Sequence, residues 1–117
     1  MQIGEERCSG ILVFAPKGRV DSTTASELEQ RLLTPVGSGE RRVVVDMVGI
    51  DYISSAGLRV FLRLAKKLKE VGGGLALAAM GEPVRQVFEL AGFLPLFAIE
   101  PSRELALARL GPERKGA

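Results

Sequence analysis

The sequence predicts a single α/β domain whose mixed, mostly parallel sheet has four to five strands and is packed with about four helices. A chain of 117 residues and 12.5 kDa has the size of one domain. Its 46% hydrophobic and 26% charged residues are typical of a globular protein. Short apolar stretches alternate with amphipathic segments, which is the pattern of right-handed strand–helix–strand crossovers in a parallel sheet.

The first apolar stretches indicate two short strands at residues 11–15 and 18–20. Pro16 and Lys17 separate them as a turn would, so we expect the two strands to pair with each other. A helix is predicted from residue 21 because one set of apolar residues then keeps helical spacing: Ala25, Leu28 and Leu32.

The ends of this first helix carry their own signals. Thr24 and Glu27 have the spacing of a capping box, in which each side chain bonds the backbone amide of the other residue. Pro35, Gly37 and Gly39 are expected to end the helix.

Residues 41–47, RRVVVDM, form the best candidate for a central strand, because a β-branched run without polar alternation is typical of a strand covered on both faces. The helix after residue 54 combines an apolar stripe with a charged face. The stripe comprises Leu58, Phe61, Ala65 and Leu68, and the charged face comprises Arg59, Arg63, Lys66 and Glu70.

The remaining elements are a buried strand at 75–80, a helix within 81–93, a short strand at 96–99 and a last helix within 101–111. The helix within 81–93 has Pro83 in its first turn and Gly92 after its end. The last helix is expected to turn Leu105 and Ala108 inward. We therefore expect one domain over residues 1–110 and a disordered C-terminal tail over residues 111–117.

Composition excludes several kinds of chemistry. The chain has no histidine and one cysteine, Cys8, which removes histidine-assisted nucleophiles, internal disulfides and thiolate metal sites. No catalytic residues, metal or cofactor are expected, because Asp21 and Asp46 alone make a thin Mg²⁺ site and the glycine clusters match no nucleotide-binding motif. With a net charge of +2, apolar runs too short to cross a bilayer and no signal-peptide pattern, we expect a cytoplasmic protein that binds neither nucleic acid nor membrane.

The stretch DYISSAGLRVFL, residues 51–62, carries the candidate site. Ser54 and Ser55 lie where a helix begins, and one serine is enough to accept a hydrogen bond from a first-turn amide. Gly57 costs roughly 1 kcal/mol of helix propensity relative to alanine, so it indicates a first turn that another backbone or a phosphate must approach closely. The second serine is then free for another role.

The chain resembles the STAS domain of bacterial anti-sigma-factor antagonists, also called anti-anti-sigma factors. The resemblance is carried by VVVDMVGIDYISSAGLRVFLRLAKKLKEVGG at residues 43–73, and extends to GRVDSTTASELEQRL at 18–32 and to residues 75–107. It implies a STAS-like single domain. In this family a serine before Gly-Leu is phosphorylated by a partner anti-sigma factor that is itself a serine kinase.

Aligned on Gly57 and Leu58, the resemblance implies that Ser55 is the phosphorylated serine. The family's well-known form has Asp before that serine and Ser or Thr after it, whereas this chain has Ser54 and Ala56, so Ser54 is the alternative acceptor. The implied partner-binding surface comprises Asp21, Ser22, Ser54, Ala56, Gly57, Leu58 and Arg59, with Asp46 in a supporting position. Asp21 could instead be an N-cap, Asp46 a loop-forming residue and Arg59 a solvated helix residue.

The resemblance implies partner switching in transcription regulation without enzymatic activity. The unphosphorylated protein would bind its anti-sigma kinase and free the sigma factor, phosphorylation at Ser55 would abolish binding, and a serine phosphatase would restore it. A monomer is expected when the protein is unbound. The alternative is a non-switching STAS scaffold subunit of a lipid-transporting ABC complex or a signalling assembly, because a fold alone does not decide function.

Overall fold

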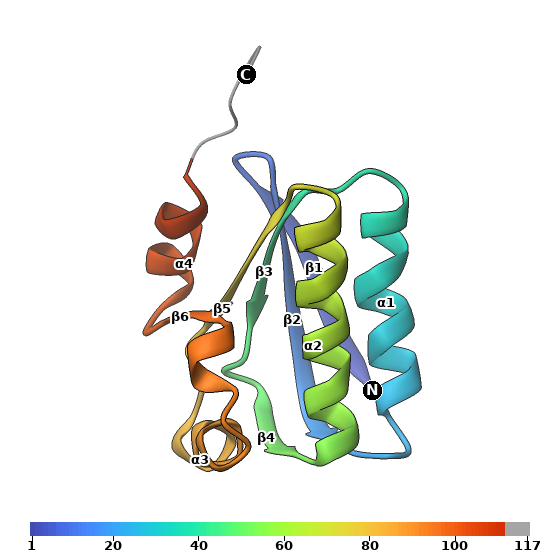
Figure 1. Ribbon diagram of the computed structural model, residues 1–117, viewed down its shortest axis with the longest axis vertical. Helices are drawn as coiled ribbons and strands as arrows, with labels where there is room; N and C mark the ends of the chain where they lie inside the picture. The colour runs from blue at the N-terminus through green and yellow to red at the C-terminus, as the bar shows by residue number, and fades with distance from the viewer. Residues whose placement is uncertain (112–117) are drawn as a thin grey trace.

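The computed structural model describes residues 1–111, and it confirms a mixed α/β domain with four α-helices (Figure 1). Of the expected tail, only Gly111 is described, where it follows the last helix with a positive φ of 72°. In chain order the elements are β1 (Gln2–Cys8), β2 (Ile11–Val20), α1 (Ala25–Gly37), β3 (Arg42–Asp46), β4 (Ile50–Ile53), α2 (Ser55–Glu70), β5 (Gly74–Ala78), α3 (Glu82–Leu90), the 3-10 helix η1 (Leu94–Leu96), β6 (Ala98–Glu100) and α4 (Arg103–Leu110).

The sheet is mostly parallel and has the order β1-β2-β3-β5-β6, with β4 paired to the far end of β2. Among the strands within residues 1–111, β1 alone is antiparallel to its neighbour. The described residues thus form six strands, whereas the sequence predicted four to five. The strands missing from the prediction are β1, an edge strand with mostly exposed residues, and β4, a strand of four residues with two exposed. Neither has the apolar run by which buried strands are recognised.

The predicted turn at Pro16 and Lys17 is wrong, because β2 is one continuous strand. Its residues 12–14 pair with β3 and its residues 18–20 pair with β4. Pro16 lies between these two paired segments, so its missing amide hydrogen interrupts neither parallel ladder. The strand therefore continues across Pro16, whereas a proline inside a fully paired central strand would remove a ladder hydrogen bond.

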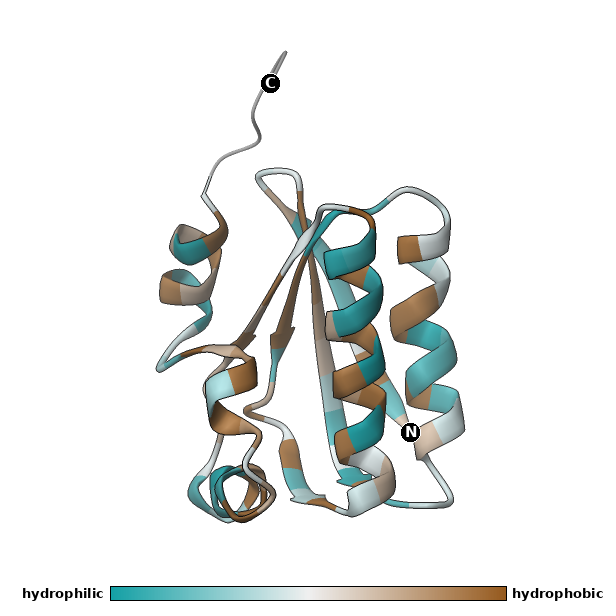
Figure 2. Ribbon diagram, viewed as in Figure 1, coloured by the Kyte–Doolittle hydropathy of each residue, from teal (hydrophilic) through white to brown (hydrophobic). Residues whose placement is uncertain are grey.

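Helices cover the sheet on both faces, as the unbroken apolar run of β3 predicted. The larger core cluster joins Val43 and Val45 to Leu28 of α1, Phe61 of α2 and Phe88 of α3. The smaller cluster lies on the other face, where α4 contributes Ala106: Ile11, Val13, Val44, Ala76, Ala78 and Ala106. Figure 1 shows α1 and α2 side by side over one face, and Figure 2 shows that the central strands β3 and β5 are apolar along much of their length.

The helix ends and faces hold three corrections. Pro35 lies inside α1, which ends only at Gly37, and α2 buries Leu64 where Ala65 was expected. In α4 the buried residue is Ala106, while Leu105 is 49% exposed and Ala108 is exposed as well. Residues 105–108 are all apolar, so their periodicity could not select the inward face.

The predicted positions of four other elements are confirmed. β3, β5, α3 and β6 form close to their predicted positions, with Pro83 in the first turn of α3 and Gly92 just after it.

Within residues 1–111, no helix combines the length and apolar character needed to cross a membrane. Nor do these residues gather three or more potential metal-binding side chains in one place.

Candidate functional site

The parallel pairing of β2 with β4 brings two distant parts of the chain to one edge of the sheet. β2 ends at Val20 and β4 ends at Ile53, and these two residues are register partners. The Ser54 amide donates a 2.8 Å hydrogen bond to the Val20 carbonyl. Asp21 and the Ser54–Ser55 junction therefore lie at the same edge of the sheet, and α2 begins there (Figure 1).

The two serines of the junction have different surroundings. Ser54 is the N-cap of α2, and its hydroxyl oxygen accepts a 3.3 Å hydrogen bond from the Gly57 amide. Ser55 is the first helical residue, it is exposed, and its hydroxyl makes no hydrogen bond within the described chain. The capping function thus belongs to Ser54, which leaves the Ser55 hydroxyl accessible from outside.

Gly57 is buried under the first turn of α2 and lies against β2 and β4. A Cβ at this position would come within 2.7 Å of both Val20 Cγ1 and Ile53 Cγ1, and within 3.1 Å of the Val20 carbonyl oxygen. Of the two interpretations of Gly57, close approach of another backbone is therefore the one that accounts for it. Leu58 is also buried, with 4% of its surface exposed, so neither residue presents a side chain on the site's surface.

Asp21 organises the turn between β2 and α1. Its Oδ1 accepts hydrogen bonds from the Thr23 hydroxyl at 2.7 Å and from the Thr23 amide at 2.9 Å, and its Oδ2 lies 3.6 Å from Arg19 Nε. These hydrogen bonds, with Arg19 as a smaller contribution, lower the pKa of Asp21 below its ordinary value. The carboxylate of Asp21 is therefore held ionised and oriented beside the junction.

The predicted capping box of α1 is wrong. The Thr24 hydroxyl donates to the Arg19 carbonyl and accepts from the Asp21 amide, so it does not cap the helix. Glu27 instead lies 3.1 Å from the N-terminal ammonium group of Met1. Thr24 and Glu27 have the spacing of a capping box, but both side chains bond to groups outside the helix and not to each other's backbone amides.

A shallow hollow of about 200 Å³ lies between the first turns of α1 and α2. Three of the predicted partner-binding residues line it, namely Ser22, Ala56 and Arg59. Arg63 in the same hollow is paired with Glu29, whereas Arg59 is exposed and forms no ion pair with any described residue. The hollow thus presents one available guanidinium group on the side of the helix that begins at Ser55.

Asp46 is the predicted residue that the fold places elsewhere. It pairs with Ala78 of β5 at the end of β3, before the chain continues into β4. Its carboxylate accepts from the Val48 amide at 3.1 Å and from Arg103 Nε of α4 at 3.0 Å. Asp46 thus forms its loop and fastens α4 to the sheet, which corresponds to its loop-forming interpretation.

Two residues beside the junction were missed by sequence reasoning. Arg19 of β2 and Tyr52 of β4 are register partners, and the Arg19 guanidinium carbon lies 4.1 Å from the centre of the Tyr52 ring. Tyr52 is 40% exposed, and it is the only tyrosine of the chain. The signal that could have found Tyr52 is that the chain's single tyrosine lies two residues before Ser54. Its pairing with Arg19 depended on the unpredicted strand β4.

Comparison with known proteins agrees with this architecture. The STAS domain family matches residues 5–106 of the chain. A Bordetella bronchiseptica protein named as an anti-sigma factor antagonist, BtrV, is 46% identical over 108 residues, covering 92% of this chain and 93% of its own length. The chain therefore belongs to the STAS-domain family and, within it, to the anti-sigma factor antagonists.

Solved structures show the same fold. An anti-sigma factor antagonist from Mycobacterium paratuberculosis superposes with a TM-score of 0.86 at 26% identity, covering 93% of this chain and 92% of its own. The Bacillus antagonist SpoIIAA, solved unphosphorylated and phosphorylated, gives TM-scores of 0.79 and 0.72 at 20% and 19% identity, covering 92% of this chain and 95% and 98% of its own.

Proposed function

We propose that this protein is a phosphorylation-controlled partner switch. In its unphosphorylated form it binds an anti-sigma factor that is a serine kinase, and a sigma factor is thereby freed. Phosphorylation of Ser55 abolishes this binding, and a serine phosphatase reverses it. In this proposal the protein is a substrate of the kinase and the phosphatase, and has no catalytic site of its own. It acts as a monomer in the cytoplasm.

The division of roles between Ser54 and Ser55 carries the proposal. The Ser54 hydroxyl is half-buried and already bonded to the Gly57 amide, whereas the exposed Ser55 hydroxyl has no partner among the described residues. A kinase must reach the hydroxyl oxygen from outside and transfer a phosphoryl group to it. Ser55 meets that requirement without loss of the helix cap, so it is the acceptor we propose over Ser54.

The effect of the phosphate follows from its position. A phosphate carries about −1.5 to −2 charges at neutral pH, and the free amides of a helix's first turn favour such an anion. The modification is therefore compatible with the fold. It acts outward, because a charged and hydrated group now lies in a surface that must lose water when the kinase docks. Arg59, one turn along α2 from Ser55, is placed to attract it.

The residues around Ser55 supply the proposed docking surface. Asp21, Ser22, Ala56 and Arg59 lie around the same end of α2. The stacked pair of Arg19 and Tyr52 extends this surface along β2 and β4. The relatives support such a role, since BtrV is named as an anti-sigma factor antagonist and SpoIIAA has been solved in both phosphorylation states.

The test is mass spectrometry of the protein purified from its native cells, combined with identification of the proteins that co-purify. We expect phosphate on Ser55 in one fraction, and a kinase-like anti-sigma factor bound only to the unmodified fraction. Ser55→Glu should abolish that binding while the protein stays folded, and Ser54→Ala should preserve the switch. An unmodified protein bound to a transporter ATPase would instead support the scaffold alternative.

A further inference from the structure

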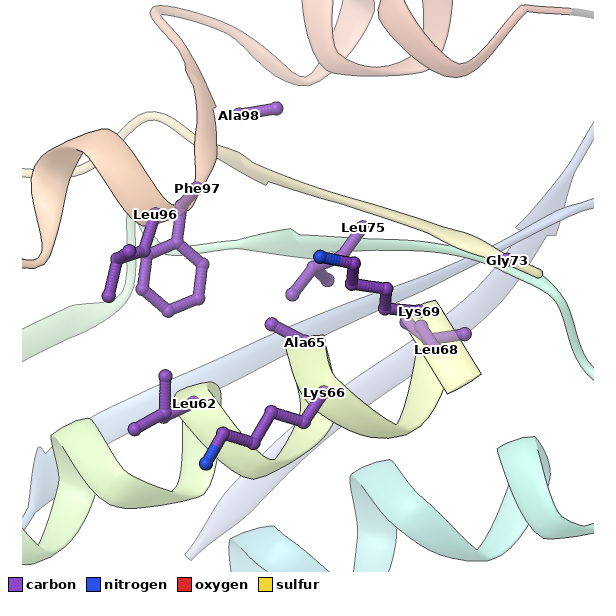
Figure 3. A pocket seen from close by; sticks show the side chains of 10 residues that line it. All are labelled: Leu62, Ala65, Lys66, Leu68, Lys69, Gly73, Leu75, Leu96, Phe97 and Ala98. Atoms are coloured by element: carbon purple, nitrogen blue, oxygen red, sulfur yellow. The ribbon is translucent and has the colours of Figure 1, made fainter. Parts of the chain in front are cut away.

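A second concave site lies on the other half of α2, away from Ser55. It is a groove of about 390 Å³ bounded by α2 on one side and by η1 and β6 on the other, with the beginning of β5 as its floor (Figure 3). Its first residue on α2, Leu62, is seven positions after Ser55, which is about 10 Å along a helix. The groove therefore shares no residue with the junction.

The walls of the groove are apolar. Leu62 and Ala65 of α2 face Leu96 and Phe97 across the gap, and Leu75 lies farther along the groove, near Ala65 and Lys69 (Figure 3). Leu96 is 55% exposed, which is high for a large aliphatic side chain in a concave site. An apolar ligand in the groove would remove this surface from water, and that is a favourable change.

The charge on the groove has one sign. Among the described residues, Lys66 and Lys69 are the charged ones that line the groove, and no acidic side chain does so. Figure 3 shows the Lys69 side chain extended over the groove beside Leu75, and the Lys66 side chain running along α2 toward Leu62. Neither ammonium group forms an ion pair with a residue in the described part of the chain.

We propose that this groove binds a medium-chain fatty acid, with its alkyl chain along Leu75, Leu96 and Phe97 and its carboxylate at Lys69. Pockets of about 300–1,000 Å³ with apolar walls and a few polar groups are typical small-molecule sites. A helix of a partner protein is about 10 Å across with its side chains, so the whole helix does not fit a hollow of this volume. Only one or two of its side chains would enter. The lysines select an anionic head group by charge complementarity.

Sodium decanoate and decyltrimethylammonium make a matched pair of probes, because they share an alkyl chain and have head groups of opposite charge. Binding is measured by calorimetry on the whole chain, and the site is mapped by amide NMR shifts. We expect decanoate to bind more tightly, with shifts at residues 62–69, 75 and 96–98. Lys69→Gln should weaken decanoate binding about threefold to fivefold, as removal of a solvent-exposed charge pair does. Lys67→Gln, on the same helix but outside the groove, should leave it unchanged.

Ala65→Leu tests the apolar wall independently, because leucine keeps the helix and fills the groove. It should abolish decanoate binding without loss of the folded NMR spectrum. Equal affinity for the two probes, shifts at other residues, or equal effects of Lys67→Gln and Lys69→Gln would overturn the proposal. Wall shifts that grow with protein concentration and without any probe would overturn it too, because a second copy of the chain would then occupy the groove. None of these outcomes depends on whether Ser55 is phosphorylated.

Discussion

Gly57 lies so close to Val20 that a Cβ on Gly57 would come within 2.7 Å of Val20 Cγ1. This contact joins the first turn of α2 to the end of β2, and so sets the height at which Ser55 emerges above the sheet. Gly57 has a low helix propensity, but close packing requires a glycine there, because any larger side chain would push the helix away from β2 and β4.

Gly57→Ala should therefore destabilise the protein, although alanine is the better helix former. Forcing an extra carbon into a packed site costs about 1–3 kcal/mol, which exceeds the roughly 1 kcal/mol gained in helix propensity over most of that range. Urea unfolding followed by circular dichroism measures the difference. Gly37→Ala is the control: apart from its chain neighbours and the helix's own backbone, no atom of the described residues lies within 4 Å of its added Cβ, so stability should hold or rise. Equal behaviour of the two variants would contradict this account of Gly57.

Ser54→Ala and Ser55→Ala should separate the two serines by stability. Loss of the N-cap hydroxyl at Ser54 should cost about 0.5–2 kcal/mol in the free energy of unfolding. The Ser55 side chain is exposed and has no hydrogen bond in the described structure, so its removal should stay within about 0.5 kcal/mol of the parent. Thermal and urea denaturation of both variants under one condition provide the comparison. A reversed order would assign the cap to Ser55.

Asp21 should titrate below an ordinary aspartate, because its hydrogen bonds with Thr23 favour the ionised carboxylate. A lowered pKa in the folded state means that the stability from Asp21 is fully present above the unfolded pKa of about 3.9. It is lost as the pH falls through the folded pKa. Carboxyl NMR titration should give a higher Asp21 pKa in Thr23→Val, which removes the hydroxyl but keeps the backbone donor.

The matched control for this titration is Ser22→Ala, since Ser22 makes no hydrogen bond to Asp21 within residues 1–111. It should leave the pKa of Asp21 where it is in the parent protein. An Asp21 pKa that does not rise in Thr23→Val would show that the Thr23 hydroxyl is not the main cause of the shift.

Arg103→Met should destabilise the attachment of α4, because it leaves the buried carboxylate of Asp46 without its cation. Asp46 is 7% exposed, so we expect a loss of about 2–3 kcal/mol in the free energy of unfolding. Arg109→Met breaks the more exposed pair with Glu100 and should cost at most about 1 kcal/mol. The double variant Asp46→Asn/Arg103→Met should recover part of the loss in denaturant unfolding, because no buried charge remains. No recovery would show that the arginine stabilises the protein through its packing or through its second ion pair, with Glu6, rather than through Asp46.

The fold class and most elements could be predicted because their signals are local. The run Val43–Val45 marks a strand covered on both faces, and the apolar stripe of α2 marks a helix lying on the sheet. The family resemblance likewise depended on a contiguous motif around Ser55. Each of these features is contained in one continuous segment of the chain, so the sequence by itself was sufficient to determine it.

The tertiary structure alone decided what depends on pairing between distant residues. β4 exists because β2 extends beyond β3, and this pairing brings Arg19 to Tyr52 and Val20 to Gly57. Both serines could cap a helix by local chemistry. Ser54 is the cap because its amide bonds Val20 and its hydroxyl turns to Gly57. Hydrogen-bond partners and close packing across the sheet are properties of three-dimensional neighbours, and spacing along the chain does not contain them.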